Sequence, residues 1–519
     1  MPTYLSPGVY VEEVGAGTRP IEGVGTAVAA FVGLAEKGPA NEPTLVSNWT
    51  QFTEKFGDFV EGSYLAHSVY GYFLNGGGNC FVVRIGANGS NGAGANGSKR
   101  AKELTGPAEA QLAGYRVHAI GRPSQKQISV EISEAGGESP PEDEFKLVVK
   151  VDGKAAETYN NVTTKPGDKN VVTKVKAASK LINLEETTSG SALAKPDMGT
   201  VDLEPPEAEP EPPSTEELGA GDYVGDAADR TGFSGLEAVD EVTMVAVPDL
   251  MAAYEQSAID LETVQAVQLA MIAHCELMGD RVAILDPPPN LSPQQVKDWR
   301  VNSAGYDSKF ATLYYPWAKV FDPASGTNKF VPPSGYMAGV WARSDDTRGV
   351  HKAPANEVVR GAIALQTQIT KAEHDLLNPV GINCVRSFPG RGVRVWGART
   401  LSSDAEWRYL NVRRLFNYLE ESILLGTQWV VFEPNDPALW ARIRRTISSF
   451  LINEWRKGAL FGLTADEAFF VKCDSETNPA EGIDAGQVIC QIGVAPVKPA
   501  EFVIFQLSQF SGGTSLVNE

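Results

Sequence analysis

The sequence predicts an α/β core with a mixed sheet and flanking helices, plus an inserted small β-rich domain and extended N- and C-terminal arms. Three observations lead to this fold class. Apolar strand-like runs alternate with amphipathic helical runs, which is typical of a parallel α/β sheet. A stretch with strand periodicity lies between two low-complexity segments. A strand-like run near each chain end has no partner beside it in the sequence.

The chain has 519 residues, of which 42% are hydrophobic, so it is long enough for several buried cores. The insertion is expected to carry a linker at each end, at 88–114 and 197–222. The expected segments are an N-terminal arm at 1–24, the first part of the core at 25–87, the insertion at 88–235, the second part of the core at 236–369, a C-terminal domain at 370–507 and a tail at 508–519.

Strand and helix patterns alternate through the core. Asn48 is suited to cap a first short helix, and Ser292 with Pro293 opens a later one, because these residue types favour helix N-termini. This strand–helix–strand order predicts a parallel sheet with right-handed crossovers. The expected strands are residues 26–34, 80–85, 242–247, 281–285 and 310–315, and the expected helices include 49–56, 63–74 and 259–278.

Two long helices and three strands are expected in the C-terminal third. The helices span 405–425 and 436–456, and Asp436 followed by Pro437 caps the second. The expected strands are residues 468–473, 488–494 and 501–507.

The insertion reads as a small β-rich domain. Apolar alternation at 128–132, 145–151 and 171–175 predicts strands, and Asp152 with Gly153 predicts a hairpin turn. The stretch 86–98, where the first linker begins, is almost wholly Gly, Asn, Ala and Ser. The second is acidic and Pro-rich, so it is expected to be extended or disordered.

Residues 334–432 are dense in Gly, Pro, Asn, Trp and Arg. These residues favour turns, kinks and flat contact surfaces. Eight of the nine tryptophans follow residue 295, and we expect them to serve both the core and an interface.

Charge and cysteine usage exclude several classes of protein. The net charge of −20 makes nucleic acid a poor partner, because phosphate contacts need Lys and Arg. The five cysteines are scattered, which suits a reducing cytoplasm better than a disulfide framework. No apolar run approaches the length of a membrane span, and the N-terminus lacks a signal peptide, so we expect no membrane insertion.

No catalytic, cofactor or metal site is expected. His274, Cys275 and Glu276 point in different directions on a helix, which favours core packing over metal binding. Asp286 ends a strand, where α/β enzymes place catalytic groups, but no base or nucleophile accompanies it. The glycines at 76–78 follow a helix instead of opening one, which favours a turn over a phosphate loop.

Several motifs together resemble the contractile tail sheath family of phage tails and related injection machines. They are YLSPGVYVEE at 4–13, VPD at 247–249, DRVAILDPP at 280–288, YYPW at 314–317 and APVKPAEF at 495–502. The resemblance covers nearly all of 1–85 and 236–510; the insertion is less typical.

The resemblance implies a structural subunit. Such subunits stack as rings around an inner tube in a metastable extended state, and contraction drives the tube through a target envelope. The implied partners are further copies of the chain, the inner tube protein, and baseplate and terminator or cap proteins. The implied location is the bacterial cytoplasm during assembly and then a phage tail or tail-like particle.

The two arms are candidates for strand exchange between subunits. A strand at the N-terminal end either pairs at the edge of its own sheet or joins another subunit by β-augmentation, and the resemblance favours the second. The candidate residues are Val9, Tyr10, Val11, Glu12, Glu13 and Val14 in the N-terminal arm, and Glu501, Phe502, Val503, Ile504 and Phe505 in the C-terminal arm.

The two long C-terminal helices carry an excess of arginine. These side chains either form a basic stripe facing an acidic tube, or lie on solvated faces with internal partners such as Glu420 and Glu421. The tube-facing candidates are Arg413, Arg414, Arg442, Arg444 and Arg445.

Two other classes of function compete with the sheath hypothesis. An α/β nucleotide-binding enzyme would need a Gly-rich loop after the first strand, but Gly23 and Gly25 precede that strand. A binding module that does not assemble is disfavoured by the unpaired terminal strands.

Overall fold

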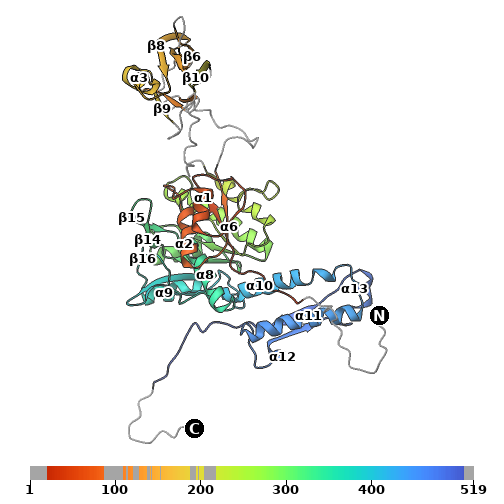
Figure 1. Cartoon of the computed structure of the whole chain (residues 1–519). Coiled ribbons are helices and arrows are strands. Elements are labelled where there is room, and N and C mark those ends of the chain that lie inside the picture. The colour runs from red at the N-terminus through yellow and green to blue at the C-terminus, as the bar shows by residue number, and fades with distance from the viewer. Residues whose placement is uncertain are drawn as a thin grey trace, which may run out of the picture. The chain divides into compact units, whose positions relative to one another are not determined.

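The computed structural model describes residues 20–86, 109–112, 115–120, 128–136, 141, 143–151, 153–186, 195–196, 198–203 and 218–507. The chain forms two compact units (Figure 1). The first unit contains Met1–Gly89 and Pro212–Glu519, and the second contains Ser90–Glu211.

An eight-stranded mixed sheet forms the centre of the first unit, in the order β18-β17-β13-β12-β11-β1-β3-β2. All neighbours from β17 to β3 are parallel, and the edge strands β18 and β2 are antiparallel. The predicted mixed sheet is therefore confirmed. The strands are β1 Ala29–Gly33, β2 Thr44–Val46, β3 Cys80–Arg84, β11 Met244–Ala246, β12 Val282–Leu285, β13 Ala311–Tyr315, β17 Ile382–Phe388 and β18 Gly392–Val395.

Helices flank this sheet, and four of them, α1, α2, α6 and α7, begin within two residues of a start that the sequence predicts. The side chain of Asn48 accepts a hydrogen bond from the Gln51 N–H, and Ser292 caps its helix in the same way through Gln295. The sequence did not predict α4, α5 or α9, and α5 follows β11 directly. The helices are α1 Trp49–Phe56, α2 Leu65–Asn75, α4 Ala220–Val224, α5 Asp249–Glu255, α6 Leu261–Met278, α7 Pro293–Asp298, α8 Ser334–Arg348 and α9 Lys371–Leu377.

Helix α8 corrects the expectation of turns after residue 334. Its glycines let it pack closely against α2: a Cβ on Gly335 would lie 2.4 Å from the Ser68 Cα, and one on Gly339 would lie 2.4 Å from the Tyr72 carbonyl oxygen. Gly71 on α2 makes the reciprocal close approach to Tyr336. Tertiary packing, which outweighs the low helix propensity of glycine, explains the difference.

Three further strands form a separate sheet in the first unit, in the order β15-β14-β16. They are β14 Ala318–Asp322, β15 Thr327–Val331 and β16 Ala362–Leu365. Short helical turns complete this part of the chain at η2 Ser234–Ala238, η3 Trp299–Ala304 and η4 Asn378–Val380.

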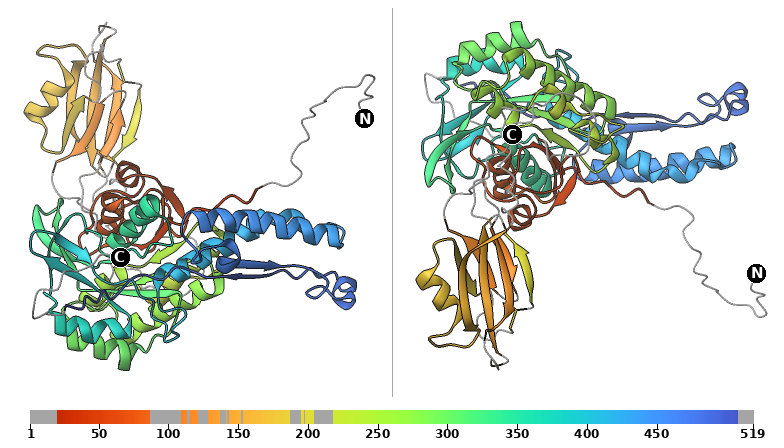
Figure 2. Two further views of the ribbon diagram at one scale, coloured as in Figure 1. Left: turned by 90° about the horizontal axis from the view of Figure 1, so that it is seen from below. Right: turned by 90° about the horizontal axis from the view of Figure 1, so that it is seen from above.

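The C-terminal part of the first unit is a helical pair packed on a two-stranded sheet. Helices α10 (Leu410–Gly426) and α11 (Pro437–Arg456) lie side by side and project beyond the eight-stranded sheet (Figure 2). Leu415 and Leu419 of α10 share an apolar core with Ile443 and Phe450 of α11. The other elements are η5 Gln428–Val430, α12 Ala465–Ala468, β19 Phe469–Lys472, α13 Ala480–Asp484 and β20 Gln491–Val494.

The second unit is β-rich with its own buried core. Its sheets have the orders β10-β6-β7-β8 and β4-β5-β9. Residues 171–175, expected as a strand, belong to α3, because Asn170 caps a helix whose Val171 and Val175 lie on one buried face. The elements are β4 Glu109–Leu112, β5 Tyr115–Ala119, β6 Ile128–Glu134, β7 Glu144–Val151, β8 Lys154–Thr163, α3 Val171–Ala178, β9 Ile182–Glu186 and β10 Gly199–Asp202.

Two expected linkers contain strands. β4 lies within 88–114 and pairs with β5, and β10 lies within 197–222 and pairs with β6. Both strands were missed because they are short and border low-complexity sequence. Val9–Val14, Asp152, most of both linkers and the tail at 508–519 lie outside the described residues. No helix in the described part of the chain has the length and hydropathy needed to cross a membrane.

Candidate assembly surfaces

The root of the C-terminal arm is tied to the body of the first unit. The N–H of Ala495 donates to the Ala468 carbonyl at 2.8 Å, and the Asn411 side-chain amide donates to the Val497 carbonyl at 3.1 Å. The Glu501 carboxylate then accepts hydrogen bonds from Arg399 Nε at 2.8 Å and from Arg399 Nη2 at 2.5 Å. The arm therefore leaves the body at a defined place.

Three groups hold Glu501 in its charged form. Asn378 Nδ2 donates to its carboxylate at 2.8 Å and the Tyr409 hydroxyl at 3.3 Å, in addition to Arg399. Burial alone would raise the pKa of Glu501, but the hydrogen bonds from Arg399 and Asn378 outweigh burial and the pKa lies below its usual value. This clamp is part of the fold and not a free strand-exchange surface.

Beyond the clamp, the arm exposes a run of apolar side chains. Phe502, Val503, Ile504, Phe505 and Leu507 are all exposed, between 68% and 99%. The expected strand at 501–507 is absent from the single chain, which corrects the prediction. A strand needs a partner for its backbone N–H and C=O groups, and the described part of the chain supplies none here.

The two-stranded β19–β20 sheet is a candidate acceptor for such an arm. Its antiparallel register joins Phe469 to Val494 and Lys472 to Gln491. Only an isolated bridge extends it within the described chain, between Leu460 and Pro496. Two strands alone are marginally stable, so a further strand along the sheet would be favourable.

The N-terminal arm also has a fixed root. Ile21 is buried in the core that α10 and α11 share, and the Val24 N–H donates to the Ser422 hydroxyl on α10 at 3.2 Å. Pro20 is exposed at the start of the described residues. The expected exchange strand, residues 9–14, precedes this root and lies outside the described residues.

The prediction that Arg413 and Arg414 lie on the surface is wrong. The side chain of Arg413 is 2% exposed and reaches Glu420 at 3.2 Å, whereas that of Arg414 is 4% exposed and bonds Asp345 at 2.5 Å. Sequence alone placed them on a basic stripe, but both guanidinium groups are inside the subunit. Arg414 also donates to the Thr26 carbonyl, which joins α10 to the chain entering β1.

The remaining candidates lie on α11 in different settings. Arg442 pairs with Glu433 at 2.7 Å, and Arg444 donates to the Cys473 carbonyl. Arg445 is exposed, and no hydrogen bond or ion pair to it is found in the described part of the chain. Arg442, Arg445 and Arg456, at helical spacing, form a solvent-facing strip that we call the basic face.

An exposed aromatic residue marks the loop between α10 and α11. Phe432 is fully exposed and has a φ of +68°, in the left-handed region that bulky residues rarely adopt. Its neighbour Val431 is also exposed. The sequence predicted turns, kinks and contact surfaces in this stretch without singling out Phe432. Strained backbone and an exposed aromatic ring together point to a contact surface.

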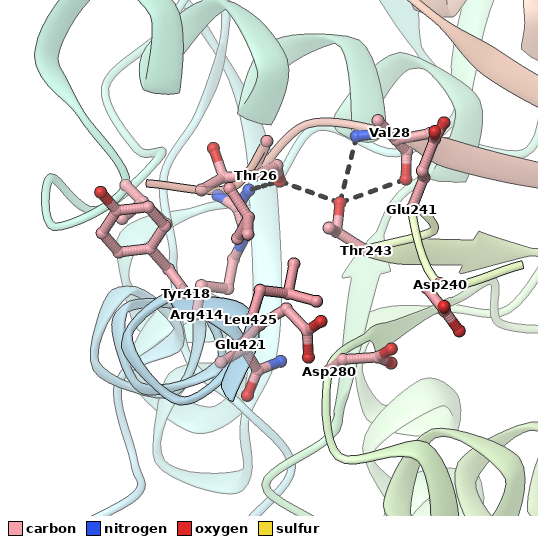
Figure 3. Close-up of a pocket in the computed structure, with 14 residues that line it drawn as sticks. Thr26, Val28, Asp240, Glu241, Thr243, Asp280, Arg414, Tyr418, Glu421 and Leu425 are labelled. Atoms are coloured by element: carbon pink, nitrogen blue, oxygen red, sulfur yellow. Dashed lines mark hydrogen bonds between the residues drawn. The ribbon is translucent and has the colours of Figure 1, made fainter. Parts of the chain in front are cut away.

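A pocket of about 410 Å³ lies where the chain entering β1 meets α10 (Figure 3). Thr243 braces the entry by donating to the Thr26 carbonyl at 2.9 Å and accepting from the Val28 N–H at 3.1 Å. Burial, and then the nearby carboxylates of Asp280 and Asp240, raise the pKa of Glu421. The bond from Arg414 to the Thr26 carbonyl, at 2.9 Å, joins this entry to α10.

Asp286 and His274 both have partners within the fold. The Asp286 carboxylate accepts from the Ser334 N–H at 2.9 Å and hydroxyl at 2.6 Å, which caps the start of α8. Burial raises its pKa to about 7, although the bonds from Ser334 act against that rise. His274 lies 3.4 Å from Arg281, and Cys275 is buried. No group of metal-ligating side chains occurs among the described residues.

Comparison with known proteins identifies the family. The profile of the phage tail sheath protein central domain matches residues 219–401, and that of the phage tail sheath C-terminal domain matches residues 402–510. The tail sheath protein of Vibrio phage KVP40 is 26% identical over 384 residues, which are 69% of this chain and 54% of that protein. The tail sheath protein of Salmonella phage ViI is 26% identical over 47% of this chain and 37% of its own length.

Solved structures share the fold over nearly the whole chain. The contracted helical sheath of the anti-feeding prophage is 25% identical, with a TM-score of 0.58 over 98% of this chain and 100% of that chain. The contracted sheath complex of PVC, an extracellular contractile injection system, is 23% identical with a TM-score of 0.58 over 98% and 99%. The chain spans about half the length of the Vibrio phage relative. It belongs to the phage tail sheath family.

Proposed function

We propose that this protein is the structural subunit of a contractile sheath that polymerises around an inner tube and contracts from a metastable extended state to drive the tube through an envelope. The observation that carries the proposal is the C-terminal arm. It is clamped at Glu501 and then exposes five apolar side chains. A soluble protein rarely leaves such a segment bare unless another chain covers it.

Strand exchange would cover this arm. Residues 502–507 of one subunit would add to the β19–β20 sheet of a neighbour, and residues 9–14 of another subunit would join the same sheet. Each backbone hydrogen bond contributes about 0.5–1.5 kcal/mol net. The sum is modest for one subunit but is repeated along the sheath, and the links persist while the bodies rotate.

Contraction needs no nucleotide in this mechanism. The stored energy lies in subunit contacts, because two packings of the same bodies differ in free energy. Phe432 and its exposed neighbour Val431 are suited to one of these contacts. The basic face on α11 is suited to an acidic inner tube. Baseplate and cap proteins would bind the two ends, and assembly would take place in the bacterial cytoplasm before the particle is released.

The second unit is proposed to lie on the outer surface, away from the tube. The sequences that join it to the first unit are rich in Gly and Asn on one side and in Glu and Pro on the other. Such joints do not suit a close-packed ring. Replacing residues 90–211, which make up the second unit, with a short Gly/Ser loop is expected to leave sheath formation intact.

Removal of residues 502–519 tests the strand-exchange mechanism. The full chain and the truncated chain are each produced with the inner tube protein and examined by electron microscopy. The full chain is expected to form striated tubes, and the truncated chain to remain a folded, soluble monomer. Normal contractile sheaths from the truncated chain would overturn the role of the arm.

A further inference from the structure

Two cysteines lie opposite each other where the β19–β20 ladder ends. Lys472 pairs with Gln491 in antiparallel register, so the next residues along, Cys473 and Cys490, are directly opposed. Opposed residues place their side chains on the same face, with Cβ atoms about 4.5–5.5 Å apart. Each thiol acts on the pKa of the other, lowering that of Cys473 and raising that of Cys490, in keeping with this placement. This placement is close to the geometry that a disulfide requires.

Asn478 keeps the two segments together past the end of the ladder. Its Nδ2 donates to the Ile489 carbonyl at 3.1 Å, and its Oδ1 accepts from the Ile489 N–H at 2.6 Å. The same Nδ2 lies 3.8 Å from the Cys473 sulfur. This buried amide therefore fixes the backbone on both sides of the cysteine pair.

We propose that Cys473 and Cys490 form a reversible cross-strand disulfide in an oxidising medium. The two thiols differ in access: Cys473 is fully buried, and Cys490 is partly exposed. An external disulfide such as oxidised glutathione therefore reaches Cys490 first. The other cysteines, Cys80, Cys275 and Cys384, are buried on elements of the eight-stranded core.

The reaction proceeds by two thiol–disulfide exchanges. The Cys490 thiolate attacks one glutathione sulfur, which breaks the S–S bond and releases one glutathione thiolate. The Cys473 thiolate then attacks the Cys490 sulfur and releases the second glutathione. The two protein thiols lose two electrons and two protons in total, and oxidised glutathione becomes two glutathione molecules.

The surroundings make this exchange slow at neutral pH and sensitive to one arginine. Burial raises the pKa of both thiols, that of Cys490 to about 12, so few thiolates are present. The Arg444 guanidinium acts in the opposite direction on both cysteines, and it donates to the Cys473 carbonyl. Arg444 is thus a positioning residue that promotes thiolate formation.

A consequence for assembly rests on the proposed function. The disulfide would close the loop of residues 473–490 and fix the end of the sheet that is proposed to accept arms from neighbours. An ordered acceptor loses less conformational freedom when a strand is added. Oxidised sheaths should therefore resist dissociation by denaturant better than reduced ones.

Peptide mapping of the free, full-length subunit tests the disulfide independently of assembly. The protein is equilibrated with mixtures of reduced and oxidised glutathione, quenched with acid, and alkylated after unfolding. Cleavage after Glu476 and Glu481 separates the two cysteines, so a disulfide leaves their peptides joined. The expected result is a linked peptide pair, with the other three cysteines alkylated.

Three variants sharpen the result. Cys490→Ser should abolish the link, Cys384→Ala should leave it unchanged, and Arg444→Gln should slow its formation several-fold and shift the pH profile of the rate to higher pH. The proposal is overturned if both cysteines stay alkylatable under oxidising conditions. It is equally overturned if Cys490 retains glutathione or links to a second copy. Failure to build sheaths with an intact link would count against the proposed function alone.

Discussion

Arg399 holds Glu501 through two parallel hydrogen bonds, of 2.8 and 2.5 Å, across a sequence separation of 102 residues. Glu501 is the last residue of the C-terminal arm that the body holds in this way before the exposed apolar run. The pair therefore determines where the arm begins.

Replacing Arg399 with Met should release the arm without unfolding the body. The variant would leave a partly buried carboxylate without its cation, which costs about 1–3 kcal/mol. We expect residues 495–507 to gain hydrogen-exchange rate and sheath yield to fall. Arg408→Met, near the same loop, is the matched control; an equal loss of yield in both variants would contradict a specific role for the clamp.

Gly339→Ala should destabilise the first unit. The new methyl group would lie 2.4 Å from the Tyr72 carbonyl oxygen and 2.8 Å from the Asn75 Cβ, so α8 and α2 must separate. Overpacking of this kind costs about 1–3 kcal/mol. Chemical denaturation measures the loss. Gly221→Ala on α4, where the added Cβ meets nothing within 4 Å, should be neutral.

The same close packing explains which parts of the fold could be predicted from sequence. Asn48 and Ser292 follow local capping rules, so both helix starts were predicted correctly. Gly335 and Gly339 read locally as turn formers, and only the neighbouring helix α2 explains why they are helical. Val171 was ambiguous, because a short apolar run suits either a strand or one face of a helix.

The candidate surfaces were only partly predictable for a related reason. Arginine excess on two helices was visible, but burial was not, so Arg413 and Arg414 could not be separated from Arg445. The partner of Glu501 is remote in sequence, so the clamp gave no local signal. The arm was predicted to be a strand, and its residues are largely β-branched and aromatic, types that favour strands. Such a pattern indicates that the segment tends to pair with another strand, but it does not identify that strand.

Phe432→Asn should raise the stability of the free subunit and weaken its assembly into sheath. Asparagine adopts a positive φ more readily than phenylalanine, so the substitution relieves strain of about 1 kcal/mol. The lost aromatic ring would remove apolar area from a subunit contact. Thermal unfolding of the monomer and sedimentation of assembled sheath measure the two effects.

Leu277→Asn provides the control for Phe432, because Leu277 is also exposed but lies on α6. It should leave assembly unchanged. If Phe432→Asn also assembles normally, the exposed ring does not contribute to a subunit contact.

Two buried carboxyl groups predict that the stability of the first unit depends on pH. Burial raises the pKa of Asp286 to about 7 and that of Asp249 to about 6. Between the ordinary value and these raised values, the folded state binds more protons than the unfolded state. Their contribution to stability therefore falls as the pH rises through that window.

Asp286→Asn tests this dependence. The asparagine can still accept hydrogen bonds from Ser334 but does not titrate. The free energy of unfolding should therefore fall less between about pH 5 and pH 7.5 in this variant than in the unaltered protein. Glu501→Gln provides a comparison of opposite sign when the series is extended below the ordinary glutamate pKa of 4.5. The pKa of Glu501 is lowered, so the stability that it contributes is lost as the pH falls through its folded pKa. Identical pH profiles in all three proteins would refute the assignment.

Charge reversal at Arg445 should weaken attachment of the sheath to its tube. Arg445 lies between the other two arginines of the basic face and makes no ion pair with the described part of the chain, so its charge is available to a partner. Attraction between exposed charges is screened within about 8–10 Å at moderate salt. Attachment of the unaltered sheath should therefore decline with salt, and Arg445→Glu should remove most of that dependence.

Co-sedimentation of sheath with tube across a salt series measures this attachment. Lys297→Glu on α7 changes the net charge equally at a site away from the basic face, and it should behave as the unaltered protein does. Arg442→Glu should have a smaller effect than Arg445→Glu, because Glu433 already neutralises Arg442 at 2.7 Å. If Arg445→Glu and Lys297→Glu show the same salt profile, the basic face does not contact the tube, and the attraction must be sought on another surface of the subunit.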